Sequence, residues 1–178
     1  MIKKCFPDFC IKNINELDEA FYIKNNIKAV IFDIDNTLVI HKEAYPTKEV
    51  LEYFDFLKSI GIKYGIVSNN KEVRVKPFCE KLDVPYAYRA FKPRKKHLRI
   101  VADELGVSYN NICFVGDQVF TDILGANRMG FVSVIVEALG ENETGFVAFK
   151  RIFERMVMDK YHSKVDKNVW FIDKFIKT

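Results

Sequence analysis

Short apolar runs alternate with amphipathic stretches through the middle of the chain. Residues 29–32 are apolar and typical of a buried strand, and residues 47–60 carry apolar side chains at helical spacing. Thr47 is placed to cap that helix and Gly61 to end it. The same pattern predicts further strands at 64–67, 85–88, 112–115 and 132–136, and helices at 71–82, 95–105 and 119–129. This alternation predicts an α/β fold, a Rossmann-like parallel sheet with helices on both faces.

The two ends of the chain depart from this pattern. Residues 1–26 are predicted to wrap around the core, with a short helix near 15–22. Residues 146–161 are predicted to form an amphipathic helix, with apolar side chains on one side at Phe149, Ile152, Phe153, Met156 and Val157.

Within the core, Asn70 is the expected cap of the helix at 71–82.

The domain organisation follows from these boundaries. We expect a single domain over residues 1–178 with a core at about 27–137 and a C-terminal helix and tail at 144–178. The core includes no inserted segment long enough to form a sizeable second layer over the sheet.

Composition narrows the class of protein. The chain is 49% hydrophobic and 29% charged, as in ordinary globular proteins. No apolar run approaches the roughly 18 residues that span a bilayer, and the first ten residues lack the apolar stretch of a signal peptide. The cysteines show no C-x-x-C spacing, which argues against a zinc site and favours free thiols in a reducing cytoplasm. We therefore expect a cytoplasmic protein without a transmembrane segment.

The net charge of +4 is unevenly distributed along the chain. Residues 148–178 carry eight Lys or Arg against four Asp or Glu, so the C-terminal segment alone accounts for the excess. A second basic cluster comprises Arg89, Lys92, Arg94, Lys95, Lys96 and Arg99. Such clusters either form solvated helix surfaces or attract anionic partners such as phosphates or acidic lipids.

Two carboxylates, Asp33 and Asp35, directly follow the first core strand. Ligands of open α/β sheets bind at the carboxyl ends of strands, so a polar loop at this position suits catalysis. The same four residues, Asp-Ile-Asp-Asn, are also compatible with a purely structural turn held by side-chain hydrogen bonds.

Three more polar groups follow predicted strands in the same way. Ser68 and Asn69 follow the strand at 64–67, Lys92 follows the strand at 85–88, and Asp117 follows the strand at 112–115, with Asp122 five residues later. Because parallel strands end at one edge of a sheet, all of these side chains are expected to converge.

This set resembles the motifs of the haloacid dehalogenase-like phosphatase superfamily. The motifs stand here as Asp33-Ile34-Asp35-Asn36-Thr37, Ser68-Asn69-Asn70, Lys92, and Gly116-Asp117 with Asp122. The resemblance implies a core without a sizeable cap domain and a hydrolase of phosphate monoesters. A response-regulator receiver domain also combines Asp, Ser or Thr, and Lys, but there the phosphorylated Asp follows the third strand rather than the first.

The resemblance also implies a role for each acidic residue. Asp33 would attack phosphorus and form an aspartyl-phosphate intermediate. Asp35 would act as general acid and then as general base. Mg²⁺ would be bound by the side chains of Asp33 and Asp117 and by the backbone carbonyl of Asp35.

The remaining motif residues are assigned to the substrate. Thr37, Ser68, Asn69 and Lys92 would contact the phosphate, and Lys92 would neutralise charge in the transition state. Asp122 would support the site by orienting either Lys92 or a metal-bound water.

A narrower resemblance concerns subfamily IIIA and its phosphatidylglycerophosphate phosphatase-like branch. It rests on Phe6-Pro7-Asp8, on the segments 88–93 and 116–122, on residues 125–130 and on the basic tail helix. It implies a lipid phosphate substrate at the inner face of the membrane and no nucleic-acid partner, and it leaves the oligomeric state open.

Other functions stay open from the sequence alone. A phosphatase of a sugar phosphate, a nucleotide or a nucleic-acid end would use the same motifs, and so would a non-catalytic phosphate-binding protein. The helix at 146–161 either packs on the domain or lies on a membrane, since its apolar and basic residues suit both.

Overall fold

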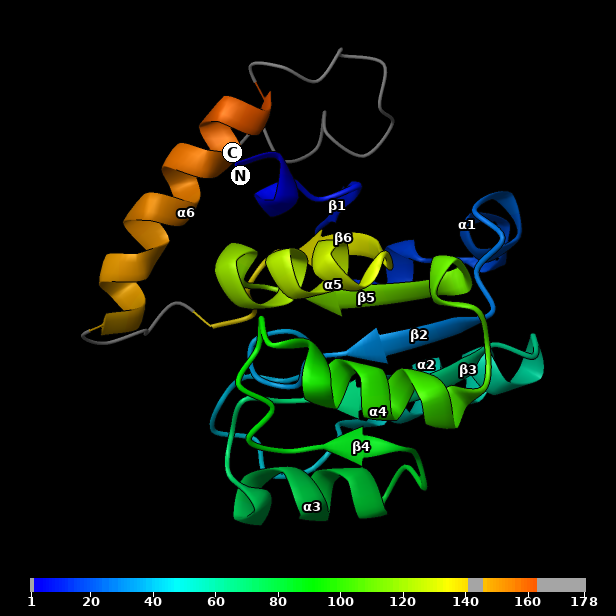
Figure 1. The fold of residues 1–178 in the computed structure, drawn as a ribbon. Coiled ribbons are helices and arrows are strands. Elements are labelled where there is room, and N and C mark those ends of the chain that lie inside the picture. The colour runs from blue at the N-terminus through cyan, green and yellow to red at the C-terminus, as the bar shows by residue number, and fades with distance from the viewer. Residues whose placement is uncertain (1, 141–145, 163–178) are drawn as a thin grey trace.

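A six-stranded, wholly parallel sheet forms the centre of the molecule in a computed structural model that describes residues 2–140 and 146–162 (Figure 1). Its strand order is β1-β6-β5-β2-β3-β4. The strands are β1 (Phe9–Ile11), β2 (Ala29–Phe32), β3 (Lys63–Val67), β4 (Tyr86–Ala87), β5 (Ile112–Gly116) and β6 (Val132–Val136). The parallel α/β sheet predicted from the alternating pattern is confirmed.

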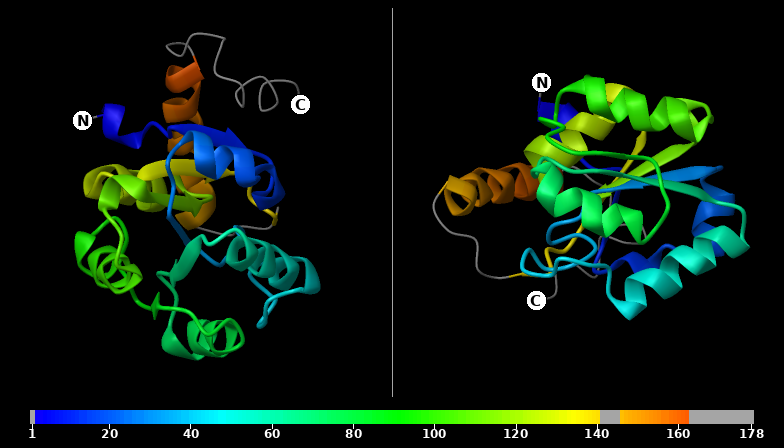
Figure 2. Two further views of the ribbon diagram at one scale, coloured as in Figure 1. Left: turned by 90° about the vertical axis from the view of Figure 1, so that its right-hand side faces the viewer. Right: turned by 90° about the horizontal axis from the view of Figure 1, so that it is seen from below.

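Helices cover both faces of this sheet, as the view along the strands shows (Figure 2). The helices are α1 (Glu19–Lys24), α2 (Lys48–Ser59), α3 (Glu72–Glu80), α4 (Lys95–Leu105), α5 (Leu124–Met129) and α6 (Phe146–His162). Side chains of β2 alternate between the faces, because successive residues of a strand point in opposite directions. Val30 and Phe32 pack with α1, α2 and α3, whereas Ala29 and Ile31 pack with α4 and α5. Every residue of β2 is therefore buried, which explains its continuous apolar run.

The helix boundaries follow the capping signals in most places. The hydroxyl of Thr47 accepts a hydrogen bond from the amide of Val50 at 3.4 Å. Gly106 and Gly130 end α4 and α5 in the left-handed conformation that glycine adopts without steric cost. Asn70 does not cap α3, contrary to the prediction. The N-cap is Lys71, because the amide group of Asn70 is instead engaged by Asp35 and by the amide of Lys71.

The N-terminal segment contributes a strand to the sheet, which the sequence pattern did not indicate. β1 pairs with β6, and the carboxylate of Asp8 accepts hydrogen bonds from the amide and the hydroxyl of Ser133. The short helix expected near 15–22 is divided into a 3-10 turn, η2 (Ile14–Glu16), and α1. Another 3-10 turn, η1 (Ile2–Cys5), precedes β1.

The stretch predicted as one helix at 119–129 has two parts. A π-helical turn, η4 (Val119–Ile123), comes first, and α5 follows it. The amide of Ile123 reaches the carbonyl of Gln118 five residues back. This wider turn contains Asp122, so it affects where that carboxylate lies. A further 3-10 turn, η3 (Tyr109–Asn111), precedes β5.

The C-terminal helix α6 packs on the domain. Tyr161 is buried against a cluster that includes Cys10 and Ile135, and the carboxylate of Glu154 accepts a hydrogen bond from the amide of Phe120. Phe153 and Met156, which the apolar stripe placed on the packing side, are exposed. The side chains of Phe149 and Ile152, residues 141–145 and the predicted tail beyond residue 162 lie outside the described residues. In the described part of the chain, no helix combines the length and the apolar character that crossing a bilayer requires.

Candidate active site

The predicted catalytic residues lie at β2 and β5, where the order of the strands in the sheet reverses. From β2 the strands continue to β3 and β4 on one side, while β5 and β6 lie on the other. Loops that follow adjacent strands at such a switch point turn away from each other and leave room for a ligand. Asp33 follows β2 and Asp117 follows β5, and these two strands are neighbours in register at Phe32 and Val115.

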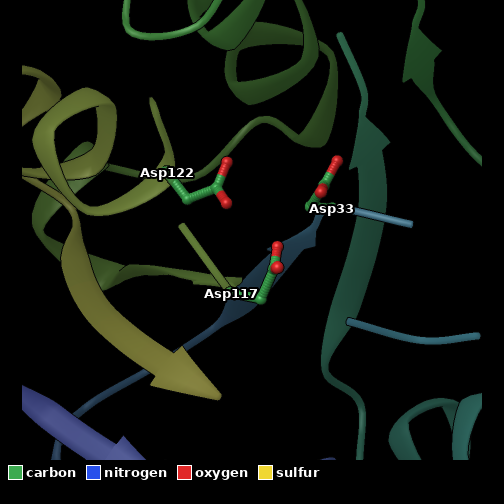
Figure 3. A group of neighbouring side chains, drawn as sticks. All are labelled: Asp33, Asp117 and Asp122. Carbon is green, nitrogen blue, oxygen red and sulfur yellow. The ribbon is translucent and has the colours of Figure 1, made fainter. Parts of the chain in front are cut away.

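Three buried carboxylates meet at this edge (Figure 3). Asp33, Asp117 and Asp122 each offer an oxygen within 4.8 Å of the oxygens of the other two. Asp33 directly follows β2, Asp117 directly follows β5 and Asp122 lies in η4, so only the folded sheet brings the three together. Divalent cations in proteins favour this donor set of carboxylate oxygens.

Gly116 makes the position of Asp122 possible. A Cβ atom at residue 116 would lie 2.5 Å from both Cβ and Cγ of Asp122. No side chain larger than hydrogen fits there while Asp122 keeps its position, because the optimal separation of non-bonded carbon atoms is about 3.5 Å or more. The glycine of the Gly116-Asp117 motif therefore serves packing within the site itself.

Lys92 links two of the carboxylates. Its Nζ lies 2.7 Å from Oδ1 of Asp33 and 2.8 Å from Oδ1 of Asp122, and all three side chains are buried. The second oxygen of Asp122 accepts a hydrogen bond from the amide of Gln118 at 3.0 Å. Asp122 thus holds Lys92 in place, and Lys92 in turn directs its charge at Asp33.

Burial and ion pairing set the protonation behaviour of this cluster. Burial raises the pKa of Asp33 to about 6, although the attraction of Lys92 opposes the shift. Burial alone would lower the pKa of Lys92, but its ion pairs with Asp122 and Asp33 outweigh burial and raise that pKa. These ion pairs therefore favour the charged ammonium form of Lys92 in the folded protein.

The charges of the cluster fit a divalent cation. Three carboxylates face a single ammonium, so the fully ionised cluster carries two negative charges in excess inside the protein. Unbalanced buried charge is costly unless it is paired or coordinated to a metal. A divalent ion would balance the excess. Asp33 and Asp117, its predicted side-chain ligands, both belong to the cluster, and their role as ligands stays a prediction.

Asp35 lies at the edge of the cluster, beside two residues that the sequence motifs did not indicate, Arg74 and His41. Its Oδ1 is 2.9 Å from Nη2 of Arg74 and 3.3 Å from Nδ1 of His41. Its Oδ2 accepts a hydrogen bond from the side chain of Asn70 at 3.2 Å. Arg74 is the third residue of α3, so it lies in the first helical turn after the loop that carries Ser68.

The loop that carries Asp33 and Asp35 is both a structural turn and a part of the site. Asn36 adopts a φ of 62°, in the left-handed region that asparagine tolerates better than most residues. Thr37 is buried and lines a pocket of about 140 Å³ whose other walls include Ile14, Val50 and Leu139. None of the residues that line this pocket belongs to the carboxylate cluster, so the phosphate contact predicted for Thr37 stays a prediction.

Ser68 and Asn69 connect the loop after β3 to Lys92. The carbonyl of Asn69's side chain accepts a hydrogen bond from the backbone amide of Lys92 at 2.6 Å. Ser68 is buried, and its hydroxyl oxygen accepts a hydrogen bond from the amide of Asn70. The hydroxyl hydrogen of Ser68 can therefore be donated to a ligand, whereas the side chain of Asn69 positions the segment that carries Lys92.

A family model independently identifies the class of the protein. The model for haloacid dehalogenase-like hydrolases matches residues 39–130, a span that includes Ser68, Lys92, Asp117 and Asp122 and begins after the Asp33 loop. Because this span is more than half of the chain, the protein belongs to the haloacid dehalogenase-like hydrolases. The predicted family and the predicted enzyme class, a hydrolase, are both confirmed.

Individual relatives extend the similarity to nearly the whole chain. Probable phosphatase YqeG of Bacillus subtilis (strain 168) is 36% identical over 165 residues, which cover 92% of this chain and 96% of the relative. Phosphatidylglycerophosphate phosphatase 1, chloroplastic/mitochondrial, of Arabidopsis thaliana is 25% identical over 150 residues, which cover 79% of this chain and 43% of that protein. A crystal structure of an uncharacterized protein from Listeria monocytogenes serotype 4b has a TM-score of 0.52 at 21% identity, covers 68% of this chain and 87% of its own, and supports the fold alone.

Proposed function

We propose that this protein is a magnesium-dependent phosphomonoesterase that works through an aspartyl-phosphate on Asp33 and hydrolyses phosphatidylglycerophosphate to phosphatidylglycerol. The observation that carries the chemistry is the buried cluster in which Lys92 bridges Asp33 and Asp122 beside Asp117. The confirmed family and the similarity to YqeG, a probable phosphatase, support the same reaction class.

The first step transfers the phosphoryl group to the protein. A carboxylate oxygen of Asp33 attacks phosphorus, a new P–O bond forms, and the bond from phosphorus to the substrate's alcohol oxygen breaks. Asp35 donates its proton to that leaving oxygen. Lys92, the hydroxyl of Ser68 and nearby amides hold the phosphoryl oxygens as charge shifts onto them. A Mg²⁺ ion held by Asp33, Asp117 and the Asp35 carbonyl would neutralise the repulsion between the carboxylates and the phosphate.

The second step releases phosphate. Asp35, now a carboxylate, takes a proton from a water molecule, and the water oxygen attacks phosphorus. The bond between phosphorus and the Asp33 oxygen breaks, so inorganic phosphate leaves and the carboxylate of Asp33 is restored. Asp122 keeps Lys92 oriented through both steps, because its ion pair with Lys92 does not involve the reacting atoms.

The open edge of the sheet supports a large or surface-bound substrate. Between β2 and β3 the chain forms only α2, and between β3 and β4 only α3, so neither connection contains a cap. A phosphate presented at a membrane can reach such a site without being enclosed. The Arabidopsis relative, named as a phosphatidylglycerophosphate phosphatase, supports the particular lipid.

A phosphate-release panel tests this proposal. Purified full-length protein with MgCl₂ is given phosphatidylglycerophosphate in detergent micelles, glycerol 3-phosphate, a hexose phosphate, a nucleoside monophosphate and a 5′-phosphorylated oligonucleotide. We expect kcat/KM for the lipid to exceed that of every soluble ester at least 100-fold. The Asp33→Asn protein, purified in parallel, controls for contaminating phosphatases.

Other outcomes of the panel would favour the alternative functions. Preference for a sugar phosphate, a nucleotide or an oligonucleotide end would keep the aspartyl-phosphate chemistry but replace the substrate. Phosphate binding without turnover on any ester would favour a non-catalytic binding protein with this fold.

A further inference from the structure

Several exposed apolar side chains lie at the edge of the sheet that holds the catalytic site. Of the ten large apolar residues that are exposed in the described part of the chain, five lie in the loops, or in the first two residues of the helices, that directly follow the carboxyl ends of strands. These five, here called the catalytic rim, are Ile40, Tyr45, Val73, Phe91 and Leu139. Because every strand of the sheet is parallel, these segments share the edge that holds the carboxylate cluster.

Phe91 is the most constrained member of the rim. The residue is 60% exposed, and its φ of 52° lies in the left-handed region, which is unfavourable for any residue with a Cβ. Both neighbours are anchored, since the amide of Ala90 donates to the carbonyl of Ser68 and the amide of Lys92 donates to Asn69. The backbone thus holds an aromatic ring outward next to catalytic Lys92, although no burial within the described chain offsets the strain.

Hydrogen bonds tie the rim loops into one surface. The amide of Arg89 donates to the carbonyl of Asn70, which joins the loop of Phe91 to the start of α3. Arg74 donates to the carbonyl of Ala44, next to Tyr45. The amide of Leu139 donates to the carbonyl of Asn36 in the Asp33 loop. These hydrogen bonds connect the rim directly to the loops that carry the catalytic residues.

The rim is flanked by positive charge. Among the described residues of the segments that carry the rim, the exposed basic ones are Lys42, Lys48, Lys71, Arg89, Arg94, Lys95 and Lys96, and the exposed acidic ones are Glu43, Glu49, Glu72 and Glu137. The guanidinium of Arg94 stacks near the ring of Phe91 at 5.7 Å from its centroid. Seven positive charges against four negative ones in these described segments favour an anionic partner.

We infer that the catalytic rim docks on an anionic bilayer, with Phe91 entering the headgroup region and Arg94, Lys95 and Lys96 contacting acidic lipids. Aromatic, aliphatic and basic side chains together suit a membrane interface. A nucleic acid would stack on Phe91 and pair with the basic residues, but it would leave Ile40, Val73 and Leu139 in water. The inference rests on the proposed lipid substrate and assigns the face of this chain that meets the membrane.

Tryptophan reporters test which face touches lipid. Phe91→Trp and the control Ile23→Trp are made in full-length Trp170→Phe protein. Ile23 is also exposed, but it lies on α1, before β2, towards the opposite edge of the sheet (Figure 1). Vesicles contain phosphatidylcholine and phosphatidylglycerol at 3:1 with brominated acyl chains. We expect the emission of Phe91→Trp to move to shorter wavelength and to be quenched, with no change for Ile23→Trp. Equal responses, or no response at residue 91, would overturn the inference.

Charge substitutions test the basic flank. In vesicle flotation at low salt, Arg94→Gln/Lys95→Gln/Lys96→Gln should lose roughly 100-fold in partitioning, since each basic residue near an anionic surface contributes about fivefold. The control Lys24→Gln/Lys28→Gln/Lys58→Gln lowers net charge equally but removes exposed lysines from outside the rim. It should change partitioning less than threefold. Equal losses in the two triple variants would mean that only net charge matters and would contradict docking by the rim. A stronger emission response of Phe91→Trp to a single-stranded oligonucleotide than to vesicles would identify the partner as a nucleic acid instead of a membrane.

The two proposals can fail separately, because these vesicles contain no substrate. If Phe91 docks on vesicles but phosphatidylglycerophosphate is not hydrolysed, the docking surface is supported and the proposed substrate is refuted. Hydrolysis of the lipid in micelles without quenching at residue 91 would support the substrate and refute the docking surface.

Discussion

Arg74, in the first turn of α3, forms an ion pair with Asp35 in the loop after β2, with 2.9 Å between Nη2 and Oδ1. Both side chains are largely shielded from solvent. Arg74 also lies over the ring of Phe78 and donates to the carbonyl of Ala44. The pair fixes the direction of the carboxylate that we propose as general acid and base. Arg74 is thus a positioning residue, because it reaches the reaction only through Asp35.

Replacing Arg74 should lower kcat most for substrates with poor leaving groups. Without the guanidinium, Asp35 loses its orientation, so an alkoxide leaves unprotonated, whereas p-nitrophenolate leaves readily without a proton. We expect Arg74→Gln to lower kcat on glycerol 3-phosphate or the lipid by roughly 100-fold, within the range of general acid catalysis, and on p-nitrophenyl phosphate by less than tenfold. Arg74→Lys should recover part of the loss. Lys76→Gln, on the exposed side of α3, is the matched control, and a uniform loss on both esters would contradict the positioning role.

Asp33→Asn should abolish phosphate release while the protein stays folded. The amide is nearly isosteric with the carboxylate, but it is a poor nucleophile and cannot form the acyl phosphate. Phosphate release, circular dichroism and thermal denaturation measure the two effects separately. Turnover by a well-folded Asp33→Asn protein would refute the proposed nucleophile.

Chelation by EDTA should stop phosphate release, and added Mg²⁺ should restore it. Ca²⁺ should support little activity, because its longer bonds and looser geometry misplace the attacking carboxylate. Activity is measured after dialysis against EDTA, with each ion titrated back. If the dialysed protein kept its full rate, Asp33 and Asp117 would not act as metal ligands in catalysis.

The stability of the metal-free protein should fall as pH rises from about 4 to about 6. The pKa of Asp33 is about 6 in the folded protein against an ordinary value of 3.8, so the folded state binds this proton more tightly than the unfolded chain does. The stabilisation is complete at low pH and is lost as Asp33 ionises, by roughly 2–3 kcal/mol at about 1.4 kcal/mol per pKa unit. Denaturant unfolding in EDTA across this range measures it. Asp33→Asn should lack this part of the pH dependence, and parallel curves for the two proteins would show that Asp33 does not cause it.

Gly116→Ala should inactivate the enzyme by displacing Asp122. The added Cβ would lie 2.5 Å from the Asp122 side chain, so that carboxylate must move and Lys92 loses a partner. We expect kcat to fall at least 100-fold. Gly61→Ala is the control, because its Cβ meets nothing within 4 Å although its φ of 73° is strained. It should lose about 1 kcal/mol of stability but keep its activity per folded molecule. Full activity of Gly116→Ala would contradict the role given to Asp122.

The core strands and their helices were predictable because both signals are local. The apolar run of β2 reflects burial on both faces, and the caps at Thr47 and Gly106 depend on a few neighbouring residues. β1 was not predictable in this way, because three residues carry little periodicity and the strand that pairs with them in the described sheet, β6, lies more than 120 residues later. The Asn70 cap failed for a similar reason, since Asp35 engages its amide from another loop.

The residue types of the site and their order after successive strands were determined by the sequence alone. Three of these residues, Asp33, Lys92 and Asp117, follow apolar segments that the sequence alone predicts to be strands. Parallel strands bring such positions to one edge of the sheet. Only the tertiary structure decided which of these groups touch. Lys92 pairs with Asp33 and Asp122, and Arg74 pairs with Asp35, because sheet register, the π-helical turn η4 and the glycine at 116 set distances of a few ångströms between atoms far apart in the chain. Ion pairs depend steeply on separation and burial, and neither quantity is encoded within a local stretch of residues.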